Sequence, residues 1–147
     1  MIDVIQCWKF NQDIQNFLIP IRITNPKSKV SIIRNCLFDT GFNGYIGLDN
    51  KTIQNLDLKK ISSGFAFTVK GKIEFNNYEI LAEIVNSSHI KLKRIKNIDE
   101  TNLNKSQDSN IIISQDFRIP ILGMKSIRQF SWIILSDEKL LCLISKK

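Results

Sequence analysis

Short apolar runs, some continuous and some alternating with polar residues, recur along most of this chain, and turn-forming residues separate them. Apolar residues at every second position are typical of strands buried on one face, and the short spacing between runs is typical of hairpins. The pattern therefore predicts an all-β domain. The expected strands cover residues 2–10, 17–24, 30–38, 65–69, 72–75, 78–85, 111–113, 119–123, 131–135 and 140–144.

The segments between these strands predict tight turns and two short helices. Asp49 can cap the first helix, and the spacing of Ile53 and Leu56 would bring both side chains to its inner face. The second helix is expected over residues 125–130. Pro20 lies inside a predicted strand and favours an edge or an irregular strand, because proline has no N–H to donate to a neighbour. The expected turns are at residues 11–13, 25–28, 70–71, 76–77 and 137–138.

Residues 86–110 are polar and charged, and most of them lack the strand and turn rhythm of the rest of the chain. We interpret the segment around 88–110 as a loop insertion and predict that 97–110 is the most mobile internal stretch. The basic run 91–96 predicts a strand with one solvated basic face, and a docking surface for an acidic partner is the alternative. His89 is interpreted as a surface residue.

The length of 147 residues predicts a single domain over residues 1–147. The longest apolar runs are too short to cross a bilayer, and the N-terminus has no secretory signal pattern, so we expect no membrane partner and a cytoplasmic location. Cys7, Cys36 and Cys142 are widely spaced, and the chain has one histidine, so no zinc site is expected. The three cysteines are interpreted as reduced, buried thiols.

The formal net charge of +7 raises the question of nucleic-acid binding. The basic residues are spread along the chain apart from the run 91–96. Aromatic residues are not interleaved with them in the way that base stacking requires. Nucleic acid is therefore not the expected partner.

The segment Asp39-Thr40-Gly41 ends an apolar strand and precedes a glycine-rich turn. The arrangement suits a carboxylate held rigidly at a strand end, because Thr40 can hydrogen bond to nearby backbone and Gly41 lets another backbone approach. The alternative for Asp39 is a carboxylate that only caps a turn. One carboxylate is a poor catalyst of peptide hydrolysis, whereas two that share a proton supply a general acid and a general base. Since the motif occurs once, the sequence predicts that two chains complete one site.

This motif, its flanking residues 36–45 and the segment Ile121-Leu122-Gly123-Met124 resemble the active-site segments of retropepsin-like (clan AA) aspartic proteases. The likeness is closest to small single-lobe prokaryotic and archaeal members, and it covers residues 16–146 except for 88–112. It implies a closed, mostly antiparallel barrel-like lobe with one or two short helices. It also implies that two lobes associate about a twofold axis, with terminal strands in the interface and with no metal or organic cofactor.

The resemblance implies roles for individual residues. Asp39 would be the catalytic carboxylate, Thr40 would brace the subunits across the dimer axis, and Gly41 would line the cleft with its backbone. Gly123 would lie beside the Asp39 loop as the partner in a psi-shaped crossing of the chain, and a plain turn glycine is the alternative. Asp116, which no Thr-Gly follows, is interpreted as a solvated turn residue rather than a second catalytic carboxylate.

Members of that family carry a hairpin, the flap, that closes over the substrate, and residues 65–75 occupy its position in this chain. We place the tip at Val69-Lys70-Gly71-Lys72, because Gly71 supplies the turn. Ser62-Ser63-Gly64 is the alternative. Lys70 at the tip departs from what an apolar peptide cleft favours.

The predicted function is an aspartic endopeptidase that acts as a homodimer on peptide or protein substrates. Asp39 of each subunit would activate a water held between them. The alternative keeps the fold without the chemistry, as a dimerisation or peptide-binding module, because a fold does not fix a function.

Overall fold

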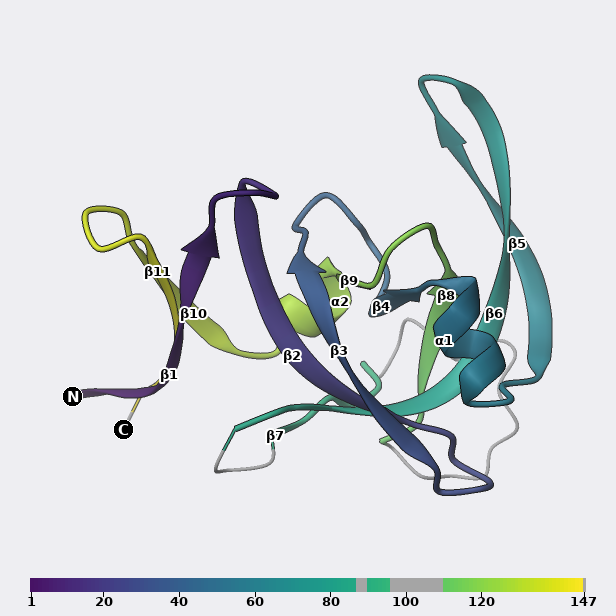
Figure 1. The fold of residues 1–147 in the computed structure, drawn as a ribbon, viewed down its shortest axis with the longest axis horizontal. Coiled ribbons are helices and arrows are strands. Elements are labelled where there is room, and N and C mark those ends of the chain that lie inside the picture. Colours follow the sequence, from purple (N-terminus) through teal and green to yellow (C-terminus); the bar gives the residue numbers. More distant parts are fainter. Residues whose placement is uncertain (87–89, 96–109, 147) are drawn as a thin grey trace.

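The computed structural model describes residues 1–86, 90–95 and 110–146, which are mostly strands (Figure 1). The predicted all-β class is confirmed, with two short helices among the described residues. In chain order the elements are β1 (Ile2–Asn11), β2 (Asn16–Thr24), β3 (Ser31–Phe38), β4 (Ile46–Leu48), α1 (Asn50–Asn55), β5 (Lys60–Thr68), β6 (Gly71–Ile84), β7 (Ile90–Lys91), β8 (Ile112–Asp116), β9 (Ile121–Leu122), α2 (Met124–Ile127), β10 (Ser131–Leu135) and β11 (Leu140–Lys146).

A closed ring of hydrogen-bonded strands surrounds the core. Its order is β2, β3, β9, β4, β8 and β6, and a pairing between β2 and β6 closes it. Alternate residues of β2 point inward, so Ile19, Ile21 and Ile23 are fully buried, together with Ile80 and Ile84 of β6. Burial of these side chains away from water is the main favourable term for such a fold.

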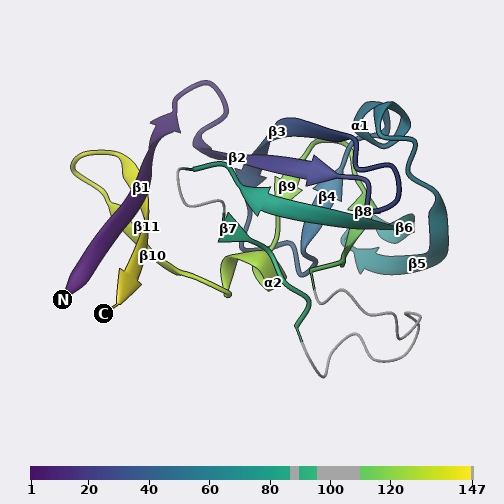
Figure 2. The same ribbon diagram turned by 90° about the horizontal axis from the view of Figure 1, so that it is seen from below.

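A second sheet region, made of β10, β11 and β1, lies beside the ring and joins it where the end of β1 pairs with the start of β2. Both chain ends lie on this side, and the β5–β6 hairpin lies at the opposite side (Figures 1 and 2). Trp132 of β10 joins the sheet to the ring, because its ring centroid is 5.2 Å from that of Phe38 and 6.1 Å from that of Trp8. Its indole N–H donates to the Ile127 carbonyl oxygen at 2.8 Å.

Cys7 of β1 and Cys142 of β11 face each other in this second sheet and form a disulfide. The prediction of three reduced thiols is therefore wrong for these two. They are 135 residues apart in sequence, and only the pairing of the two terminal strands brings them together. Cys36 is a buried free thiol, as expected, and burial raises its pKa to about 12.

The turn predicted at residues 76–77 is wrong, because β6 continues through it as one strand. Hydrogen bonds to β5 engage both asparagine side chains: Ser63 Oγ donates to Asn76 Oδ1 at 3.1 Å, and Asn77 Nδ2 donates to Ser62 Oγ at 3.0 Å. The alternative flap tip at Ser62-Ser63-Gly64 lies inside β5 and not in a turn.

Pro20 lies within β2, which pairs with strands on both sides, so its predicted edge position is wrong. Its carbonyl oxygen accepts from the Val85 N–H at 2.9 Å, and the ring nitrogen faces the same side of the strand. Pro20 lies opposite Val85, one residue beyond the end of β6 at Ile84, so the one bond that its nitrogen cannot donate falls at the end of the ladder and not within it.

The first helix follows the prediction, because Asp49 accepts a hydrogen bond from the Thr52 N–H, and Ile53 and Leu56 are buried. The second helix spans Met124–Ile127, so it begins one residue before the predicted start and ends three residues before the predicted end. Among the described residues 91–95 of the basic run, only Lys91 lies in a strand, β7 (Ile90–Lys91).

The prediction of a single domain over residues 1–147 stays a prediction. The strand predicted for the basic run is wrong for residues 92–95, where Leu92 is fully buried. His89, Lys96 and residues 97–109 of the predicted mobile loop lie outside the described residues. In the part of the chain that the structure describes, no helix is both long and apolar enough to cross a membrane.

Candidate active site

Asp39 lies directly after β3, in a loop whose backbone is tied to the neighbouring strand β9. Its N–H donates to the Leu122 carbonyl oxygen at 3.0 Å, and its own carbonyl accepts from the Phe42 N–H at 3.3 Å. Its carboxylate Oδ1 accepts from the Gly41 N–H at 2.9 Å. The carboxylate is half-buried and is held by its own loop, which leaves Oδ2 without a hydrogen bond within the described residues.

β9 runs between the two strands that flank this loop. It pairs in parallel with β3 and antiparallel with β4, and Gly123 follows it directly. The Gly123 N–H donates to the Tyr45 carbonyl at 2.9 Å, and the next two N–H groups donate to the carbonyls of Phe42 and Gly44 at 2.7 and 3.1 Å. An added Cβ at Gly123 would overlap the Gly44 carbonyl and the Phe42 ring. Only glycine permits this close crossing of two chain segments.

Tyr45 fixes the far end of the same loop. It is almost completely buried, and its hydroxyl accepts from the Ile95 N–H at 2.8 Å. Its carbonyl oxygen also accepts from the buried Ser126 hydroxyl at 2.8 Å. The loop is therefore fastened to two separate parts of the chain, Ile95 and the segment 122–126, which gives the Asp39 carboxylate a defined position.

Thr40 and Gly41, which follow Asp39 in this loop, are exposed to solvent. The Thr40 hydroxyl makes no hydrogen bond within the residues that the structure describes. The threonine therefore does not brace its own loop, and its hydroxyl is accessible to another molecule.

The β5–β6 hairpin projects beyond the ring (Figure 1). Its turn lies at Val69 and Lys70, where Gly71 adopts a φ of 113° that favours glycine. The Thr68 hydroxyl accepts from the Lys70 N–H at 3.2 Å and donates to the Gly71 carbonyl at 3.1 Å. The Lys72 ammonium does not point freely into a cleft, because it lies 4.1 Å from the centre of the Phe65 ring.

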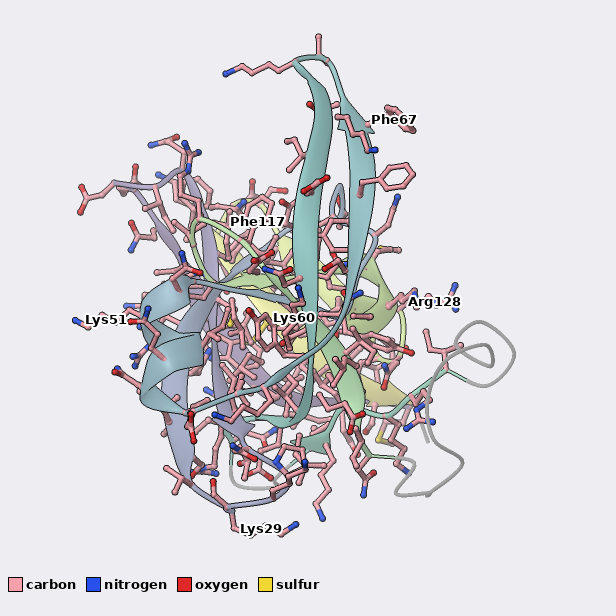
Figure 3. All side chains as sticks on the ribbon, turned by 90° about the vertical axis from the view of Figure 1, so that its right-hand side faces the viewer. Lys29, Lys51, Lys60, Phe67, Phe117 and Arg128 are labelled. Carbon is pink, nitrogen blue, oxygen red and sulfur yellow. A yellow bond between two sulfur atoms is a disulfide. The ribbon has the colours of Figure 1, made fainter. Side chains whose placement is uncertain are left out.

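Large apolar side chains of this hairpin are exposed. Phe65 and Phe67 are 54% and 79% exposed, Ile73 is 50% exposed, and Val69 is completely exposed. Figure 3 shows Phe67 near the free end of the hairpin, well away from the body of the protein. Large groups of exposed aromatic and aliphatic side chains are typical of surfaces that bind another molecule.

A cleft of about 570 Å³ lies between the Asp39 loop, the hairpin and the segment after β8. Its walls are largely aromatic and aliphatic, and the Asp39 and Asp116 carboxylates and the Lys125 ammonium supply charge. The residues that line it are Asp39, Gly41, Phe42, Asn43, Gly44, Phe65, Ala66, Phe67, Thr68, Ile73, Phe75, Gln115, Asp116, Phe117 and Lys125. Mostly apolar clefts with a few polar groups are typical of ligand sites.

Asp116 is not the solvated turn residue that the sequence predicts, because it is half-buried at the end of β8. Its Oδ1 accepts from the Asn76 N–H at 2.8 Å, and its Oδ2 accepts from Asn76 Nδ2 at 3.0 Å. Burial raises the pKa of the nearby Tyr78, and the Asp116 charge raises it further. The sequence offers no signal for the hydrogen bonds between Asp116 and Asn76, since these two residues are 40 positions apart.

The structure thus brings Asp39, Gly41 and the hairpin together around one cleft, and it adds Asp116. Gly123 does not line this cleft but contacts the Asp39 loop. Among the described residues, no group of three or more histidine, cysteine or acidic side chains could hold a metal ion. A comparison with models of known protein families found no match, and a search of curated proteins found no relative of the chain.

Proposed function

We propose that this protein is an aspartic endopeptidase whose active form is a homodimer of retropepsin-like lobes. The observation that carries the proposal is the position of Asp39. It is a strand-end carboxylate, half-buried, with one oxygen held by the Gly41 N–H, at the mouth of an apolar cleft that a long hairpin borders. The close crossing at Gly123 makes this loop rigid, as positioning of a catalytic group requires.

The chemistry needs two such carboxylates. Two carboxyl groups a few ångströms apart do not both ionise readily, so the pair holds one proton over a range of pH. The ionised group takes a proton from a water, the water oxygen attacks the peptide carbonyl carbon, and the protonated group donates to the carbonyl oxygen. The carboxyl group that took the water proton then gives it to the peptide nitrogen as the C–N bond breaks, and the other carboxylate takes a proton from a hydroxyl of the tetrahedral intermediate. The pair again holds one proton, and the products are a carboxylic acid and an amine.

Asp116 does not supply the second carboxylate in this proposal, because both of its oxygens accept hydrogen bonds from Asn76. The second carboxylate is Asp39 of another copy. Twofold association is the commonest oligomer geometry, and it places identical loops opposite each other. The exposed Thr40 hydroxyl is available to brace the two loops across that axis.

The substitution Asp39→Asn tests the chemistry. It preserves the shape of the side chain but removes its charge and its exchangeable proton, so cleavage of a broad peptide library should be abolished while the fold is kept. Asp137→Asn, in the exposed β10–β11 turn, is the matched control and should cleave like the wild type. Equal cleavage by wild type and Asp39→Asn would exclude the proposed mechanism.

A dimerisation or peptide-binding module is the second candidate. The observation that favours it is the hairpin tip, where Lys70 is charged although an apolar peptide cleft favours an apolar residue, and where the Lys72 ammonium lies over the Phe65 ring. In that case peptides would bind in the cleft, and neither wild type nor Asp39→Asn would cleave them at any pH.

The cytoplasmic location stays a prediction, and the Cys7–Cys142 disulfide bears on it. Disulfides persist in oxidising compartments and are rare in the cytosol of most cells. Alkylation of thiols at the moment of cell lysis separates the two cases. A reduced compartment gives three modified cysteines in the denatured chain, and an oxidising one gives only Cys36.

A further inference from the structure

The base of the β5–β6 hairpin is the point along β6 where its pairing with the ring strand β8 ends. From Asn77 onward β6 pairs with β8, starting with Asn77 opposite Gln115. On the other side of that point, β6 pairs only with β5, and its residues up to Glu74 are exposed. The end of the β6–β8 ladder is therefore the boundary between the rigid ring and the projecting hairpin.

Asp116 occupies that boundary. The register would next place Asn76 opposite Asp116, but the Asp116 side chain takes the place of a backbone partner. One carboxylate oxygen accepts from the Asn76 backbone N–H and the other accepts from the Asn76 side-chain amide. The Asn76 amide oxygen in turn accepts from the Ser63 hydroxyl on β5. The single carboxylate thus links both strands of the hairpin to the ring.

The ring side of this contact is firmly held. Asp116 pairs with Leu48 of β4, and the following Phe117 N–H donates to the Leu48 carbonyl at 2.7 Å. Ser114, two residues earlier on β8, is fully buried. The Asp116 carboxylate thus belongs to β8, a strand of the ring that is paired with β4. Asn76 belongs to β6, the strand that continues into the free end of the hairpin.

We propose that Asp116 is a positioning residue that fastens the β5–β6 hairpin to the wall of the Asp39 cleft. Its carboxylate sets the direction in which the hairpin leaves the ring, and therefore the height of the hairpin over the cleft that both carboxylates line. The fastening itself is a property of the folded chain. Its consequence for peptide cleavage rests on the function proposed above.

Hydrogen exchange of backbone amides tests the fastening without any substrate. In Asp116→Ala both hydrogen bonds are lost, and amides of residues 63–75 should exchange about tenfold faster, as expected for loss of bonds to a charged acceptor. Amides of β2 should exchange at the wild-type rate. Asp137→Asn is the matched control, and it should change neither region. Unchanged exchange of residues 63–75 in Asp116→Ala would overturn the proposal.

The conservative variant Asp116→Asn separates positioning from chemistry. Its amide oxygen can still accept from the Asn76 N–H, and the Asn76 amide can turn so that its oxygen accepts from the new amide while Ser63 accepts from the Asn76 nitrogen. Exchange of residues 63–75 in Asp116→Asn is therefore expected to be at most about threefold faster than in wild type, because both bonds are kept and only their charge is lost. If Asp116→Ala does not fold, Asn76→Ala replaces it. This variant loses one of the two bonds to Asp116 and also the bond from the Ser63 hydroxyl, and the hairpin should exchange at least about threefold faster; no change would overturn the proposal.

Peptide cleavage gives a further readout that distinguishes this proposal from the previous one. Asp116→Ala should raise KM severalfold with kcat within about twofold of wild type, whereas Asp39→Asn should abolish kcat. Cleavage abolished in Asp116→Asn would mean that the carboxylate acts in the chemistry, and the positioning role would be wrong. Faster hairpin exchange in a protein that cleaves nothing would leave the fastening supported and the protease proposal rejected.

Discussion

The disulfide between Cys7 and Cys142 leads to a prediction whose size follows from the chain length that it closes. Replacing both cysteines by alanine removes a cross-link between residues 135 apart in sequence. In the chain-entropy description, a loop of this length stabilises the fold by about 5 kcal/mol, because the cross-link restricts the unfolded chain. Domains of ordinary stability unfold at a cost of about 5–15 kcal/mol, so the loss would be a large part of the total.

Urea unfolding followed by tryptophan fluorescence is a suitable assay, because Trp8 and Trp132 pack against each other in the sheet that carries the disulfide. For a urea dependence of about 2 kcal/mol per molar, the unfolding midpoint should fall by about 2.5 M. A reductant added to wild type should produce the same shift. The same reductant added to the double alanine variant is the control, and it should have no effect.

Two results would contradict this reasoning. The first is a wild-type midpoint that reductant does not move. The second is a count of three reactive thiols in denatured protein that has not been reduced, where the structure requires one, from Cys36.

Three further predictions concern the site, the core and the dimer. Gly123→Ala should destabilise the fold by about 1–3 kcal/mol in thermal unfolding, because its Cβ overlaps the Gly44 carbonyl, and an unchanged midpoint would show that the crossing is looser than described. The pKa of Cys36 is raised from 9.0 to about 12, so its contribution to stability is present below pH 9 and is lost as the pH rises toward 12. Urea unfolding across that range should show a decline that Cys36→Ala lacks. Cleavage should follow a bell-shaped pH profile on the acidic side of neutrality and should rise per chain with protein concentration, and the Asp39→Asn dimer should be no weaker than wild type in sedimentation, because repulsion between the two carboxylates is removed.

The strands that were predictable from the sequence are those whose apolar alternation matches their burial. β2 is the clearest case, because every second residue from Phe17 to Ile23 is buried in the folded chain. The cap at Asp49 was predictable for a similar reason, since the residues that form it are neighbours in sequence. The signal in both cases is local.

The features that the sequence did not reveal depend on partners far away along the chain. Asn76 and Asn77 are turn-forming by composition, but Ser62, Ser63 and Asp116 hydrogen bond to them and keep the backbone extended. The cysteine pair escapes notice because its partners lie in the first and last strands. Asp116 looked like a surface residue because its only apparent neighbours were those adjacent in sequence.

Three features of the single chain would each gain a partner if two chains associated. Asp39 is one carboxylate where peptide hydrolysis needs two, and the Thr40 hydroxyl has no hydrogen bond among the described residues. The hairpin exposes Phe65, Phe67 and Val69 to water. Covering these apolar side chains would lower the free energy, so their exposure favours association over an isolated chain. A peptide alone could cover the hairpin, but it supplies neither a second carboxylate nor a partner loop for Thr40. Association of two chains supplies both, and the space between the two hairpins and loops is then available for a peptide. The protease proposal therefore depends on dimerisation more than on any single residue of the cleft.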